Sequence, residues 1–102
     1  MAMLPQQLLS AALRVRWDVG AHDALRLLAE RAPGFDTQQY NEAYRRAAGL
    51  DDRAYDLAAA WFASGGLPQR WPNAVELEGL CPGFAPGDYD EAIEKNILWA
   101  RK

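Results

Sequence analysis

Residues 33–43 read PGFDTQQYNEA, and residues 82–92 read PGFAPGDYDEA. The two stretches lie 49 positions apart and agree at six of their eleven positions. Each stretch is flanked on both sides by sequence with helical spacing of apolar residues. The pattern therefore predicts an internal pseudo-repeat in which one helix, a sharp corner at Pro-Gly-Phe and a second helix occur twice.

The first corner has the clearest helix start in the chain. Asp36 can cap the helix, and Gln39 can reach back to it, which is the reciprocal arrangement called a capping box. Phe35 precedes the cap and Tyr40 lies one turn inside the helix, which is the spacing of a hydrophobic staple. Gly34 would end the preceding helix in a left-handed conformation that other residues adopt only at a cost.

The second corner repeats this arrangement with one change. Phe84 and Tyr89 stand at the staple positions around Ala85, and Gly83 takes the place of the first corner's glycine. We therefore expect two aromatic clasps, each fixing the angle between successive helices.

Apolar residues recur at three-and-four spacing along the whole chain, whereas the alternation typical of strands is almost absent. This predicts an all-α fold, a compact bundle of five or six short helices forming a single helical domain over residues 1–102. Gly49 is expected to end the third helix, and the fourth should begin again at Asp51 or Asp52. The expected helices cover about 5–17, 21–31, 36–49, 51–65, 74–80 and 86 to near the C-terminus.

The stretch LLAERAPGFDTQQYNEAYRRAAGLDDRAYDLAAAWF, residues 27–62, resembles a ubiquitin-associated domain, a family with a Met-Gly-Phe corner after its first helix. Pro33 stands where that family has methionine, and the resemblance covers about a third of the chain. The resemblance implies a three-helix fold for this stretch and carries no function with it.

Composition places the chain among ordinary globular proteins, since half of its residues are hydrophobic and a quarter are charged. No apolar run approaches the ~20 residues that span a bilayer, so we expect no membrane association. The net charge of −3 is uneven: residues 1–50 carry six arginines against five acids, and residues 51–102 carry five basic residues against nine acids. An acidic half disfavours nucleic acid, whose binding needs a dense basic surface.

The sequence offers little for catalysis. With one histidine, His22, and one cysteine, Cys81, the chain cannot form a Cys/His zinc cage or an intrachain disulfide. We therefore predict no catalytic residue, no bound metal and no cofactor, and a reducing, cytoplasmic setting. Asp88, Asp90 and Glu91 could hold a hard cation, but acidic residues also suit the first turn of a helix.

The segment around residues 52–65 is the most informative about partners. It is apolar nearly all round, which indicates a helix that is either enclosed in the core or covers a partner. Three alternatives follow: packing in the core alone, packing in the core together with self-association as a homodimer or another homo-oligomer, and docking of a second protein. The partner-binding residues predicted on this basis are Tyr55, Trp61 and Phe62, together with Trp71 in the following proline-containing loop, which could instead pin that loop to the bundle.

The repeat also contains two glutamates, Glu42 and Glu91, that the staple does not explain. They could form a polar pseudo-symmetric site, or be exposed helix carboxylates, with Glu91 pairing with Lys95 one turn on. The sequence thus favours a non-catalytic protein-interaction or regulatory module that self-associates.

Two alternatives remain open at this stage. One is a nucleic-acid-binding domain with a helix-turn-helix around Gly49 carrying Arg45, Arg46 and Arg53. The other is a small carboxylate- or metal-dependent enzyme using Glu42 and Glu91.

Overall fold

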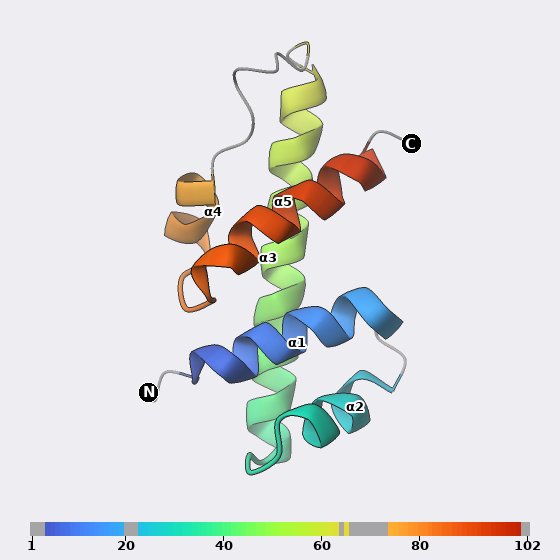
Figure 1. Ribbon diagram of the computed structural model, residues 1–102, viewed down its shortest axis with the longest axis vertical. Coiled ribbons are helices and arrows are strands. Elements are labelled where there is room, and N and C mark those ends of the chain that lie inside the picture. The colour runs from blue at the N-terminus through green and yellow to red at the C-terminus, as the bar shows by residue number, and fades with distance from the viewer. Residues whose placement is uncertain (1–3, 20–22, 64, 66–73, 101–102) are drawn as a thin grey trace.

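The computed structural model of the chain describes residues 4–19, 23–63, 65 and 74–100, and these residues form helices and turns without a strand. The all-α prediction is confirmed. The helices are α1 (Gln6–Val19), α2 (Ala24–Arg31), α3 (Thr37–Ala63), α4 (Ala74–Leu80) and α5 (Pro86–Ala100). Figure 1 shows α3 as a central rod that α1 and α5 cross steeply, with α2 beside the first half of α3 and α4 near its second half.

The molecule extends over 45 × 27 × 18 Å, and the contact face of α3 is lined with small residues. Its buried stripe runs along the whole helix and includes Ala43, Ala47, Ala54 and Ala58. Small side chains let helix axes approach closely. Larger buried side chains fill the space beside these crossings. They include Leu8, Leu9, Leu13, Leu28, Leu50, Leu77 and Ile93.

The expected helix break at Gly49 is wrong, because α3 runs through this position as one helix of 27 residues. A glycine inside a helix costs only ~1 kcal/mol relative to alanine. Ala47 lies before Gly49 and Leu50 after it, and both are fully buried, so the packing of both halves requires a continuous helix. The described chain thus holds five helices where five or six were expected.

Two further expectations depended on a helix break at Gly49. The helix-turn-helix hypothesis is wrong, because no turn separates the two segments that were to form it. The three-helix fold implied for residues 27–62 is wrong as well, since this stretch contains most of α2 and one uninterrupted α3. The end of α3 lies near the predicted position, and Gly65 adopts a positive φ of 100° just beyond it; Gly66 lies outside the described residues.

The first corner has the predicted staple and capping box. The Phe35 and Tyr40 rings meet edge to face with centroids 6.0 Å apart. Asp36 and Gln39 exchange both bonds of the capping box, at 2.9 and 2.8 Å. The sequence did not predict a further contact, in which the Tyr40 hydroxyl accepts from the Phe35 amide at 3.3 Å and donates to the Ala32 carbonyl at 2.7 Å.

The second corner has the same local geometry. The Phe84 and Tyr89 ring centroids are 6.1 Å apart, again edge to face. The Tyr89 hydroxyl accepts from the Phe84 amide at 3.2 Å and donates to the Cys81 carbonyl at 2.8 Å. Gly83 has a φ of 108°, close to the 102° of the first corner's glycine. The helices around the corners differ in length, since α3 has 27 residues and α5 has 15.

Within the described residues, no helix combines the length and the apolar character needed to cross a bilayer.

Candidate functional sites

The second half of α3 carries three of the four predicted partner-binding residues. Tyr55 is 46% exposed, while Trp61 and Phe62 are partly buried against the core with their ring centroids 4.7 Å apart. Trp71, the fourth, lies outside the described residues. We name residues 54–63 the α3 apolar end.

The α3 apolar end is not enclosed on all sides. Among its ten residues, only Ala54 and Ala58 are buried, and Asp56 is the one charged residue. Its outer positions include Tyr55 and the exposed Ala59, Ala60 and Ala63. The outer face of this segment is therefore not enclosed by the described chain, and a role in self-association or docking stays a prediction.

Glu42 and Glu91 both form ion pairs. Glu42 accepts from Arg46 at 3.1 Å and lies 3.6 Å from Arg45 on the same helix. Glu91 pairs with Arg14 of α1 at 3.2 Å, whereas the expected partner was Lys95, which lies over the Trp17 ring. The glutamates thus have electrostatic partners on different helices, and a pseudo-symmetric polar site remains a prediction.

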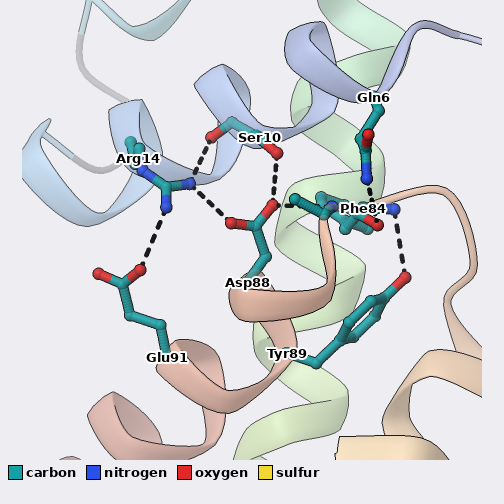
Figure 2. A network of polar contacts seen from close by, with 8 residues as sticks. Gln6, Ser10, Arg14, Phe84, Asp88, Tyr89 and Glu91 are labelled. Atoms are coloured by element: carbon teal, nitrogen blue, oxygen red, sulfur yellow. Dashed lines mark hydrogen bonds and ion pairs between the residues drawn. The ribbon is translucent and has the colours of Figure 1, made fainter.

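A cluster of polar contacts joins α1 to the second corner (Figure 2). Gln6 donates to the Phe84 carbonyl at 3.1 Å, and Ser10 donates to the Asp88 carboxylate. Arg14 binds the same carboxylate at 2.9 Å. These α1 residues are spaced four apart, so they share one face of the helix.

Asp88 is only 2% exposed, and it also accepts from the Ala85 amide at 3.1 Å at the start of α5. It therefore takes the position of Gln39 in the first corner's capping box, although Ala85 has no side chain to return the bond. Its oxygens are occupied by Arg14, Ser10 and this amide. Across the described chain, no three His, Cys, Asp or Glu side chains are grouped as metal ligands.

A second buried carboxylate, Asp51, joins three helices. It accepts hydrogen bonds from Arg16 at 2.9 Å and Trp17 at 3.3 Å on α1, and from Asn96 at 2.8 Å on α5. Burial lowers the pKa of the Arg16 guanidinium, but Asp51 and, to a smaller extent, Tyr44 together outweigh this effect, so the pKa lies above its ordinary value. We name Asp51 with its three donors the Asp51 junction.

A pocket that sequence reasoning missed opens between the middle of α3 and the second corner. Its volume is about 270 Å³, and its lining residues are Arg46, Gly49, Leu80, Cys81, Pro82 and Phe84. Burial raises the pKa of the Cys81 thiol, and the nearby positive charge of Arg53 opposes this only in part. No local motif marks such a pocket, because its walls come from segments about thirty residues apart.

Comparison with known proteins gives no relative: no family model, curated protein or solved structure matches the chain.

Proposed function

We propose that this chain is a non-catalytic protein-interaction module that self-associates through the α3 apolar end. The observation that carries the proposal is the 46% exposure of Tyr55 on a helical segment with a single charged residue. Aromatic side chains are enriched in the cores of protein interfaces, whereas charged residues are depleted there.

The shape of this surface favours a second copy of the same helix as the partner. Ala59 and Ala63 lie beside Tyr55 on the outer face of the helix and would let two helices approach closely. Most soluble oligomers are symmetric, and a two-fold axis brings the same patch of both subunits together. Tyr55 and the neighbouring alanines of both copies would then become buried. Within the α3 apolar end, only Asp56 would bring like charges near each other across the interface.

Two other features belong to the same proposal. The partly buried, single Cys81 supports a reducing, cytoplasmic setting. The matching rings, hydroxyl contacts and glycines of the two corners support an internal pseudo-repeat that supplies scaffold, with function residing on the outer face of α3.

Sedimentation velocity over a range of micromolar concentrations tests the self-association. We expect the unaltered chain to sediment as a dimer and Tyr55→Asp to sediment as a monomer, because an aspartate in an apolar interface loses its hydration without a partner. Val75→Asp is the matched control, since Val75 is an exposed apolar residue on α4, and this variant should remain a dimer. A monomer at every concentration for the unaltered chain, or equal dimerisation of Tyr55→Asp, contradicts the proposal.

A further inference from the structure

The pocket beside the second corner has the size and lining of a small-molecule site. Its wall is formed by Leu80, Pro82 and Phe84, and Arg46 contributes a positive charge. An apolar cavity of about 150 Å³ admits benzene. At about 270 Å³, this pocket has room for an aromatic ring with a short substituent.

Gly49 lines this pocket, and neither packing nor conformation requires a glycine there. It lies inside α3, and a Cβ added to it would meet no atom within 4 Å. The described glycines with positive φ are Gly34, Gly65 and Gly83, so Gly49 has no backbone angle that excludes alanine. A helix-interior glycine costs ~1 kcal/mol relative to alanine. Because Gly49 has no side chain, it leaves open space at the pocket wall.

Arg46 is the charged residue among those that line the pocket, and it is ion-paired with Glu42. Arg46 uses its Nε atom in the ion pair with Glu42, and the two terminal nitrogens of a guanidinium carry four further donors. Arg53 lies two turns further along the same face of α3, and its charge acts on Cys81. A negative group entering the pocket would therefore meet the terminal nitrogens of Arg46, while the positive charge of Arg53 acts near Cys81.

We propose that this pocket binds a small carboxylate with an apolar body, such as an aromatic or short aliphatic acid. The apolar body packs against Leu80, Pro82 and Phe84, and the carboxylate accepts hydrogen bonds from Arg46. This proposal does not depend on dimerisation, because none of the pocket residues belongs to the α3 apolar end.

Cys81 provides a direct readout of occupancy, because it is the single cysteine of the chain and it lines the pocket. The probe is 3-phenylpropionate, and its neutral counterpart is 3-phenylpropan-1-ol. The rate at which iodoacetamide alkylates Cys81 is measured while each compound is titrated. We expect saturable protection by the acid and about tenfold weaker protection by the alcohol, since a hydrogen bond between two charged groups is stronger than one to a neutral hydroxyl.

Two variants test separately the contribution of the Arg46 charge and that of the open space at Gly49. Arg46→Gln should weaken protection by the acid about tenfold and leave that by the alcohol unchanged. Arg45→Gln is the matched control, because Arg45 also pairs with Glu42 but does not line the pocket, and it should bind as the unaltered chain does. Gly49→Leu should abolish protection by both compounds without lowering the melting temperature.

Three results would overturn the proposal: no protection of Cys81 at millimolar acid, equal protection by acid and alcohol, or unchanged affinity in Arg46→Gln. The measurements are repeated in Tyr55→Asp, so that protection by a second copy of the chain is distinguished from protection by the ligand. Unchanged acid binding in that variant is the expected result, whatever the oligomeric state.

Discussion

At the scale of single residues, each corner depends on two aromatic side chains with different tasks. Tyr40 and Tyr89 each satisfy a backbone amide and a backbone carbonyl in the bend, where the regular helical hydrogen bonds stop. Phe35 and Phe84 close the bend by packing on those tyrosines. The corners differ in burial: Phe84 is buried, with Gln6 and Leu9 of α1 beside its corner, whereas Phe35 is only partly buried.

Phe84→Ala should therefore destabilise the protein more than Phe35→Ala. Phe84 is 6% exposed and Phe35 is only partly buried. Truncating a buried phenylalanine costs about 3–5 kcal/mol in the free energy of unfolding, and we expect Phe84→Ala to fall in this range. Urea denaturation followed by circular dichroism measures both variants. Equal losses, or a loss below about 1 kcal/mol for Phe84→Ala, would show that the second clasp does not have its inferred role.

The sequence predicted the corners because all their determinants lie within eleven consecutive residues. Spacing alone placed Phe35 against Tyr40 and Asp36 against Gln39. It did not predict the tyrosine hydroxyl bonds, because spacing places the rings without fixing what the hydroxyl groups bind. It did not predict the partner of Glu91, because that contact depends on how the chain folds back. Arg14, for example, lies 77 residues before Glu91.

At the scale of elements, the continuity of α3 shows that a glycine does not by itself predict the end of a helix. The starts of α3 and α5 followed from a capping aspartate and from Pro86, whose preference for the first turn is strong. Gly49 was expected to stop a helix, but its local cost is about 1 kcal/mol. Burying Ala47 and Leu50 in one stripe outweighs that cost.

Gly49→Ala should consequently stabilise the protein by up to about 1 kcal/mol, because it improves helix propensity and its methyl group meets no atom. Gly83→Ala should have the opposite effect, since its φ is +108° and the new Cβ would lie 3.1 Å from Leu9 Cδ1. Gly34→Ala is the control that has a similar φ but no close neighbour. The melting temperatures should rank Gly49→Ala above the unaltered chain, then Gly34→Ala, then Gly83→Ala. A lower melting temperature for Gly49→Ala would mean that α3 needs this glycine structurally.

At the scale of the whole molecule, α3 carries α1 and α2 on its first half and α4 and α5 on its second, and polar contacts join the halves (Figure 1). The cluster around Asp88 and the Asp51 junction both connect α1 to α5 or its corner. The sequence predicted one domain but none of these contacts. Charged residues such as Asp51 and Asp88 had an ordinary local explanation at helix starts, and only the fold reveals their burial.

The Asp51 junction leads to the last prediction, that the chain unfolds as one unit whose stability depends on this carboxylate. Asp51→Ala removes the acceptor shared by Arg16, Trp17 and Asn96, although Asn96 keeps its bond to the Ala92 carbonyl. Removing one partner of a buried charge pair costs about 3–5 kcal/mol, and we expect the lower end of this range because the Arg16 side chain is 26% exposed. Asp52→Ala is the matched control: its side chain is 76% exposed and lies 3.7 Å from Arg16, so we expect a loss below about 0.5 kcal/mol.

Tryptophan fluorescence and far-ultraviolet circular dichroism should report coincident urea transitions for the unaltered chain, because both halves share α3 and are joined across it. Asp51→Ala should shift both transitions together to lower urea concentration. Separate transitions in the unaltered chain would mean that the two halves are independent folding units. Equal stability of Asp51→Ala and Asp52→Ala would mean that packing along the alanine stripe of α3, rather than the buried carboxylate, holds α1 and α5 in place.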